Sequence, residues 1–114
     1  MWLCYTENMT TPTVSVVIPA INEEENLPHV FAALPEDVDQ VVLVDGNSTD
    51  QTVAVAKSLR PDVVIVQQTR TGKGNALACG FAVATSDIIV MIDADGSTDP
   101  KEIPLFVAKL MAGY

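Results

Sequence analysis

Two aspartates separated by one residue are the clearest candidates for chemistry in this chain. Asp93 and Asp95 lie in the stretch IDADGSTDP (residues 92–100), directly after the apolar run IIVM. Carboxylate oxygens are preferred ligands of Mg²⁺ and Mn²⁺, and these ions also bind phosphate groups. Gly96 lets the backbone turn sharply beside a ligand. The pair therefore indicates a metal site for a phosphate-bearing molecule, and a solvated acidic turn is the alternative interpretation.

The third aspartate of this stretch has a structural interpretation. Asp99 is followed by Pro100 and Glu102, which is typical of a helix that begins after an acidic N-cap with proline in its first turn. We therefore expect Asp99 to cap a helix, and its replacement by alanine to lower stability. Pro104 falls inside the same apolar helical pattern, so the first turn is expected to be a separate tight turn.

Three more polar clusters follow apolar runs of the sequence. They are PAINEE (residues 19–24), DGNSTD (residues 45–50) and RTGKG (residues 70–74). Each has an ordinary explanation, as a helix cap, an Asp-Gly turn and a flexible glycine turn. The spacing of GKG does not fit a Walker A loop, and no GxGxxG follows a predicted strand, which disfavours a P-loop and an NAD site.

The elements that position these clusters alternate between strand and helix. Strands are predicted at residues 13–20, 40–45, 62–68 and 87–93, and their continuously apolar character indicates a parallel sheet covered on both faces. Helices are predicted at about residues 25–34, 48–59, 74–84 and 100–110, the second with Ser48 as N-cap and Gln51 completing a capping box. This order predicts an α/β fold, a Rossmann-like three-layer sandwich with a mainly parallel sheet. In such a sheet all four clusters would meet at the carboxyl edge, where ligands bind.

Composition limits the classes of partner. The 114 residues are 48% hydrophobic, which indicates one packed domain, and the net charge of −9 argues against nucleic acid as a partner. No apolar run is long enough for a transmembrane segment. Cys4 and Cys79 form neither a zinc motif nor a disulfide framework, so the cytoplasm is the expected compartment, including a position on the inner face of a membrane. Residues 1–12 are expected to be a disordered leader, and residues 13–114 the folded domain.

The four motifs PAINEEEN, VDGNSTDQT, GKGNAL and DADGSTDP resemble, in this order and spacing, the N-terminal half of a family 2 glycosyltransferase with the GT-A fold. The resemblance is nearest to polyprenyl-phosphate sugar transferases and glucosyl-3-phosphoglycerate synthases. It implies inverting transfer of a sugar from a UDP- or GDP-linked donor to a polyprenyl phosphate or a small phosphorylated molecule, with Mg²⁺ or Mn²⁺ as cofactor. The donor-binding residues that it implies are Pro19, Ala20, Glu23, Asp45, Gly72, Lys73 and Asp93, and the metal ligands are Asp95 and Asp93.

The resemblance also implies a second half that would supply the acceptor site and the general base. We therefore expect this chain to be a donor-binding half that is catalytically incomplete, and no general base is assigned. The strand at residues 87–93 is expected to lack a neighbour, which leads to the hypothesis of a homodimer or larger assembly. A non-catalytic nucleotide-binding or assembly module is the alternative function. A sugar-1-phosphate nucleotidyltransferase is less favoured, because no glycine-rich loop follows the first strand.

Overall fold

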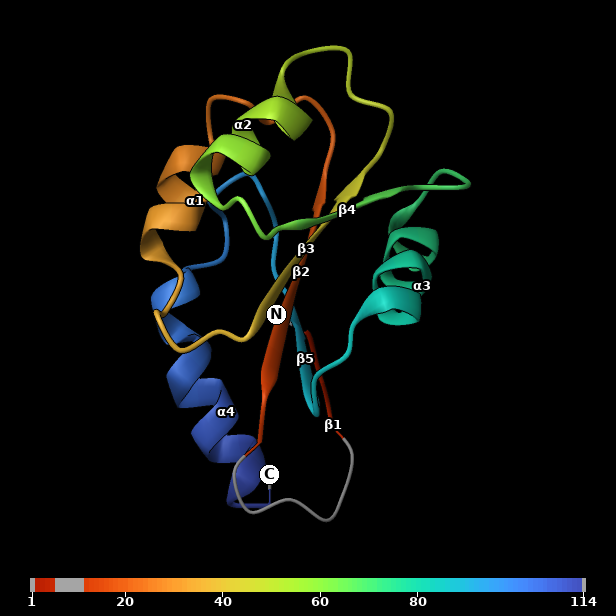
Figure 1. Cartoon of the computed structure of the whole chain (residues 1–114). Coiled ribbons are helices and arrows are strands. Elements are labelled where there is room, and N and C mark those ends of the chain that lie inside the picture. The colour runs from red at the N-terminus through yellow and green to blue at the C-terminus, as the bar shows by residue number, and fades with distance from the viewer. Residues whose placement is uncertain (1, 6–11, 114) are drawn as a thin grey trace.

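A five-stranded sheet forms the centre of the molecule (Figure 1). The structure is a computed structural model that describes residues 2–5 and 12–113. The strand order is β1-β5-β2-β3-β4. Strands β2 (Val14–Ala20), β3 (Gln40–Asp45), β4 (Val64–Gln67) and β5 (Ile88–Met91) are parallel, whereas β1 (Trp2–Tyr5) is antiparallel to β5. The mainly parallel sheet confirms the predicted fold class.

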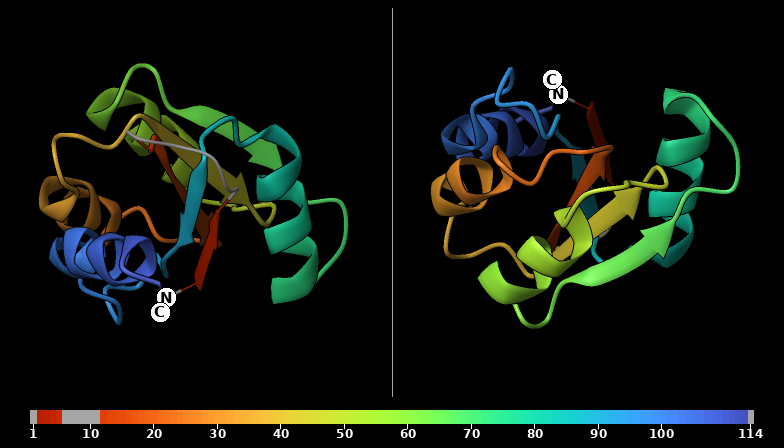
Figure 2. Two further views of the ribbon diagram at one scale, coloured as in Figure 1. Left: turned by 90° about the horizontal axis from the view of Figure 1, so that it is seen from below. Right: turned by 90° about the horizontal axis from the view of Figure 1, so that it is seen from above.

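Helices cover both faces of this sheet. The helices are α1 (Leu27–Ala33), α2 (Thr52–Leu59), α3 (Lys73–Val83) and α4 (Ile103–Met111), the last preceded by the 3-10 turn η1 (Pro100–Glu102). Figure 2 shows α3 alone on one face, with α1, α2 and α4 on the other. The result is a three-layer α/β sandwich. Among the described residues, no helix has both the length and the apolar composition that a membrane crossing requires.

The core is divided by the sheet into two apolar clusters. Alternate side chains of one strand belong to different clusters, because successive residues of a strand point to opposite faces. Val16 and Ile18 of β2 pack in the cluster on the α1, α2 and α4 side, and Val17 packs in the cluster beneath α3. All three are fully buried. Burial on both faces explains why the strands have continuous apolar sequences and no alternation.

The N-terminus differs from the sequence prediction. Trp2–Tyr5 is expected to belong to a disordered leader, but it forms β1 and pairs with β5 over four residues. The remaining leader residues 1 and 6–11 lie outside the described residues. Strand β5 consequently has neighbours on both sides, β1 and β2. The unpaired strand on which the hypothesis of self-association rests is therefore not present. A four-residue edge strand carries too little local pattern for detection, since only its pairing partner identifies it.

Two predicted helix starts have different outcomes. Asp99 caps the first turn as expected, because its side chain accepts a hydrogen bond from the backbone N–H of Lys101 at 3.0 Å, and α4 begins only afterwards at Ile103. The capping box at Ser48 is wrong, since α2 begins at Thr52. Ser48 instead takes part in contacts within and between loops: its N–H donates to Asp45, and its hydroxyl accepts from the N–H of Asn22.

Candidate functional site

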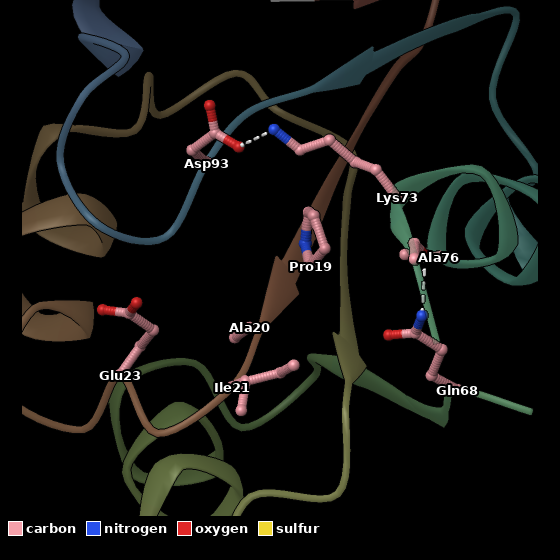
Figure 3. Close-up of a pocket in the computed structure, with 9 residues that line it drawn as sticks. Pro19, Ala20, Ile21, Glu23, Gln68, Lys73, Ala76 and Asp93 are labelled. Atoms are coloured by element: carbon pink, nitrogen blue, oxygen red, sulfur yellow. Dashed lines mark hydrogen bonds and ion pairs between the residues drawn. The ribbon is translucent and has the colours of Figure 1, made fainter. Parts of the chain in front are cut away.

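The carboxyl ends of the parallel strands surround a cavity of about 310 Å³, called here the edge cavity. It opens where the loops after β2 and β5 meet the first turn of α3 (Figure 3). Six residues singled out from the sequence line it, together with three that sequence reasoning missed. The six are Pro19, Ala20, Glu23, Gly72, Lys73 and Asp93, and the three are Ile21, Gln68 and Ala76. The fold thus brings residues from three of the four sequence clusters to one place.

An ion pair crosses the edge cavity. The Nζ atom of Lys73, the first residue of α3, lies 2.8 Å from Oδ1 of Asp93, two residues after β5. The hydrogen bond to Asp93 and the negative charges of Asp93 and Asp95 raise the pKa of Lys73, so its ammonium form is maintained at neutral pH. Both side chains are partly open to solvent, with 63% of Lys73 and 34% of Asp93 exposed. The pair therefore stays accessible to a charged ligand.

The second aspartate of the DAD motif lies beside the edge cavity and does not line it. Asp95 is exposed, and its Oδ1 accepts a hydrogen bond from the backbone N–H of Ser97 at 2.9 Å. Hydrogen bonds from the hydroxyl and the backbone amide of Ser97 hold the pKa of Asp95 below its usual value. Gly96, with φ of +83°, makes the turn between these two residues. Asp95 is thus an ionised carboxylate held at a turn, so the acidic-turn interpretation and a ligand role are compatible here.

The carboxylates of this site can hold a divalent metal only when a bound phosphate group and waters supply the remaining ligands. Among the residues that the structure describes, no group of three or more His, Cys, Asp or Glu side chains is arranged to hold an ion. Asp93 and Asp95 offer two carboxylates, which is the number that Mg²⁺ typically takes from a protein when substrate phosphates and waters complete its six ligands. These two aspartates therefore fit a metal that binds together with a diphosphate.

Asp45 does not line the edge cavity. Its side chain is 3% exposed and accepts the N–H of Ser48 through both oxygens, at 3.2 and 3.4 Å. Its backbone oxygen also accepts the N–H of Gln68 at 2.8 Å, which extends the pairing of β3 and β4 by one bond. In this structure Asp45 organises the loop after β3. Its predicted contact with a nucleobase stays a prediction.

Gln68 is the most informative residue that sequence reasoning missed. Its side-chain Nε2 donates to the backbone oxygen of Gly72 at 2.8 Å, which ties the residue after β4 to the glycine directly before α3. Gly72 has φ of +101°, a conformation that favours glycine. A smaller hollow of about 210 Å³ adjoins the edge cavity and shares Ile21, Gln68 and Gly72 with it. The sequence offers one indication of this role, because Gln68 is a polar residue at the carboxyl end of a predicted strand, where ligands bind.

Asn22 fastens the loop after β2 to the loop after β3. It adopts a left-handed conformation with φ of 53°. Its side-chain Oδ1 accepts the backbone N–H groups of Thr49 at 2.8 Å and Asp50 at 3.3 Å. The next residue, Glu23, donates its own N–H to the hydroxyl of Thr52 at 2.9 Å. These contacts fix the backbone of Glu23, whose side chain lines the edge cavity.

Comparison with known proteins identifies the family. The sequence pattern of "Glycosyl transferase family 2" matches residues 15–114. This chain belongs to that family. The match covers nearly the whole chain and includes all four motifs from which the resemblance was inferred.

Relatives and solved structures agree with this assignment. An uncharacterized glycosyltransferase of Mycobacterium tuberculosis is 44% identical over 105 residues, which are 92% of this chain and 47% of that protein. Undecaprenyl-phosphate 4-deoxy-4-formamido-L-arabinose transferase of Sodalis glossinidius is 38% identical over 121 aligned positions, covering 93% of this chain and 37% of the relative. The chain thus spans about half the length, or less, of these relatives.

Among solved structures, glucosyl-3-phosphoglycerate synthase from Mycobacterium tuberculosis is similar in fold. Its complex with Mn²⁺, UDP and glucosyl-3-phosphoglycerate superposes with a TM-score of 0.76 at 31% identity, covering 90% of this chain and 40% of that chain. A complex of the same enzyme with Mg²⁺ and UDP gives the same values. The three-layer sandwich of this chain is therefore the fold of GT-A glycosyltransferases.

Proposed function

We propose that this chain forms the donor-binding part of a metal-dependent glycosyltransferase that takes its sugar from a nucleoside diphosphate. The observation that carries the proposal is the edge cavity, where Lys73 and Asp93 face each other at the carboxyl ends of the strands. The chain has a net charge of −9, so a diphosphate needs local compensation. Lys73, the first turn of α3 and a divalent ion held by Asp93 and Asp95 would provide it.

The chemistry follows from where negative charge develops. Transfer breaks the bond between the anomeric carbon and the diphosphate oxygen, and the bonding electrons stay with the nucleoside diphosphate. A bound divalent metal would act as a Lewis acid that stabilises this charge on the leaving group. The ammonium of Lys73 adds a positive charge at the same place, which orients the diphosphate and lowers the barrier electrostatically. Inversion at the anomeric carbon, as implied by the family resemblance, requires the acceptor hydroxyl or phosphate oxygen to attack from the opposite side.

UDP is our first choice of nucleotide, and a phosphate-bearing molecule is our choice of acceptor. The similar structures hold UDP with Mn²⁺ or Mg²⁺, and one also holds glucosyl-3-phosphoglycerate. The name of the Sodalis glossinidius relative specifies undecaprenyl phosphate. Undecaprenyl phosphate carries a phosphate group, and so does the phosphoglyceric acid that another complex of the synthase holds together with UDP-glucose. The general base remains unassigned.

Isothermal titration calorimetry tests the proposal. UDP and GDP are titrated into the wild type and Asp95→Ala, with and without Mn²⁺. We expect metal-dependent binding of UDP to the wild type and a loss of about tenfold or more in Asp95→Ala, because a charged ligand of the metal is removed. Asp62→Ala is the matched control. Asp62 is an exposed aspartate that pairs with Arg60 before β4, at the opposite edge of the sheet.

Two results would contradict the proposal. The first is absence of binding by either nucleotide in the presence of Mn²⁺, and the second is equal affinity of the wild type and Asp95→Ala. Incubation with UDP-glucose, with and without phosphoglyceric acid as acceptor, then separates an active enzyme from a binding module. Release of UDP supports a catalytically active chain, whereas tight binding without turnover supports the binding module.

A further inference from the structure

Lys73 and Asp93 make contacts that compete with those needed for a metal. Figure 3 shows the Lys73 side chain reaching from α3 across the edge cavity to Asp93, over Pro19. The ammonium lies 2.8 Å from Oδ1 of Asp93. The other oxygen, Oδ2, accepts the hydroxyl groups of Ser97 at 3.4 Å and Thr98 at 3.5 Å. One oxygen of the proposed metal ligand is therefore paired with the ammonium before any metal arrives, and the other lies within 3.5 Å of two hydroxyl groups.

The ion pair between Lys73 and Asp93 can be broken at little energetic cost. A side chain that is 63% exposed gains little from an ion pair, because water screens the charges and the long stem loses entropy when it is held. The backbone at its base is anchored, since Gln68 bonds Gly72 directly before it. An added Cβ at Gly72 or Gly74 would meet nothing within 4 Å, so space surrounds the base of the side chain on both sides. Because most of the Lys73 side chain is exposed to solvent, rotation about its own bonds is enough to take the ammonium away from Asp93.

We propose that Lys73 is an exchangeable cation: it occupies Asp93 in the nucleotide-free protein and moves to the diphosphate when nucleotide and metal enter together. This inference rests on the proposed function, because it needs Asp93 to be a metal ligand. In the nucleotide-free protein, Lys73 thus competes with the metal for Asp93. In the protein with nucleotide and metal bound, it contacts the diphosphate. Metal and nucleotide consequently bind with positive cooperativity, since each removes an obstacle for the other.

The charge distribution supports this exchange. Among the described residues that line the edge cavity, Lys73 is the only cation. If Lys73 left Asp93 with no replacement, Asp93 and Asp95 would stand as two uncompensated negative charges in an acidic chain. A divalent ion restores the balance, and the diphosphate then offers the displaced ammonium a new anionic partner. Neither nucleotide nor metal alone supplies both replacements.

The test is a pair of titrations on neutral and charged variants of Lys73. Mn²⁺ is titrated into the nucleotide-free protein, and UDP is titrated at saturating Mn²⁺. The proteins are the wild type, Lys73→Met, Lys73→Gln and Lys73→Arg. Lys57→Met is the control, because Lys57 is an exposed lysine on α2 that does not line the edge cavity. Thermal unfolding confirms that each variant is folded.

We expect the neutral variants to change the affinities for Mn²⁺ and for UDP in opposite directions. Both neutral variants should bind Mn²⁺ alone about two- to fivefold more tightly than the wild type, the range expected from removing an exposed ion pair. They should bind UDP about tenfold or more weakly, because a charge-assisted hydrogen bond to phosphate is lost. The affinity of Lys73→Arg for Mn²⁺ alone should stay within about twofold of that of the wild type, because arginine keeps the positive charge that competes with the metal for Asp93.

Each other outcome overturns a specific statement. If the neutral variants bind Mn²⁺ alone no more tightly than the wild type, while the wild type binds UDP with metal, the exchange is wrong and the proposed function stands. If UDP affinity is unchanged in the neutral variants, Lys73 does not move to the diphosphate, and the exchange is again wrong. If the wild type binds no nucleotide at any Mn²⁺ concentration, the proposed function itself fails.

Discussion

A single glycine decides how closely α3 lies on the sheet, and its replacement gives a quantitative test of the fold. Gly80 of α3 is buried against Val17 at the centre of β2. A Cβ atom added at Gly80 would lie 2.4 Å from Cγ1 of Val17 and 3.2 Å from its Cγ2. Val17 is fully buried and its β-branched side chain is stiff, so it cannot turn aside into solvent. Gly80→Ala must therefore push α3 away from the sheet.

Two opposing effects determine how much Gly80→Ala changes the free energy of unfolding. Overpacking by one methyl group in a closely packed core costs about 1–3 kcal/mol. Alanine in place of glycine inside a helix stabilises the folded state by about 1 kcal/mol, because alanine has the higher helix propensity. Gly74→Ala is the matched control on the same helix, because its added Cβ meets nothing within 4 Å and keeps only the favourable effect. The difference between the two variants isolates the packing cost, about 1–3 kcal/mol.

Thermal unfolding followed by circular dichroism measures this difference. For a chain of 114 residues the entropy of unfolding is about 0.24 kcal/mol per kelvin, so 1 kcal/mol corresponds to about 4 °C in Tm. Gly80→Ala should thus unfold about 4–12 °C below Gly74→Ala. Equal Tm values for the two variants would refute the close seating of α3. Because α3 begins with Lys73, a displaced helix should also weaken nucleotide binding in Gly80→Ala.

Three further predictions concern the loops that carry the site. Asp99→Ala should lower stability by about 0.5–2 kcal/mol in urea unfolding, because the N–H of Lys101 loses its cap, and an unchanged midpoint would contradict the cap. Asn22→Ala should lower stability by about 2 kcal/mol, through the strain of a positive φ and the loss of an acceptor for two backbone amides, whereas Asn22→Gly should cost about half as much. Hydrogen bonds, chiefly from the Thr52 hydroxyl, hold the pKa of Asp50 below the usual value of an aspartate. The stabilising effect of the ionised Asp50 is therefore present above the pKa of the unfolded chain and is lost as the pH falls through the lower pKa of the folded state. Asp50→Asn should accordingly lose less stability than the wild type between about pH 5 and about pH 2.5, and equal losses would show that Asp50 does not contribute.

The sequence by itself determined the fold class and most of the residues that line the edge cavity. Four continuously apolar runs are long enough to be recognised as strands buried on both faces, and their helices follow from apolar spacing and from Pro100 as a start signal. Because parallel strands end at one edge, local sequence also places Pro19, Lys73 and Asp93 near one another. This reasoning works because each element is specified by its own residues.

Tertiary structure decided the features that depend on a partner distant in sequence. Trp2–Tyr5 becomes a strand only because β5 offers a free side for pairing, more than 80 residues later. Ser48 does not cap α2, which begins at Thr52, and its hydroxyl accepts the N–H of Asn22 from another loop. Likewise, the DAD motif predicts two metal ligands, but only the folded chain brings the Lys73 ammonium onto Asp93. Local sequence encodes which groups are present, and the packing of the loops decides which of them are already occupied.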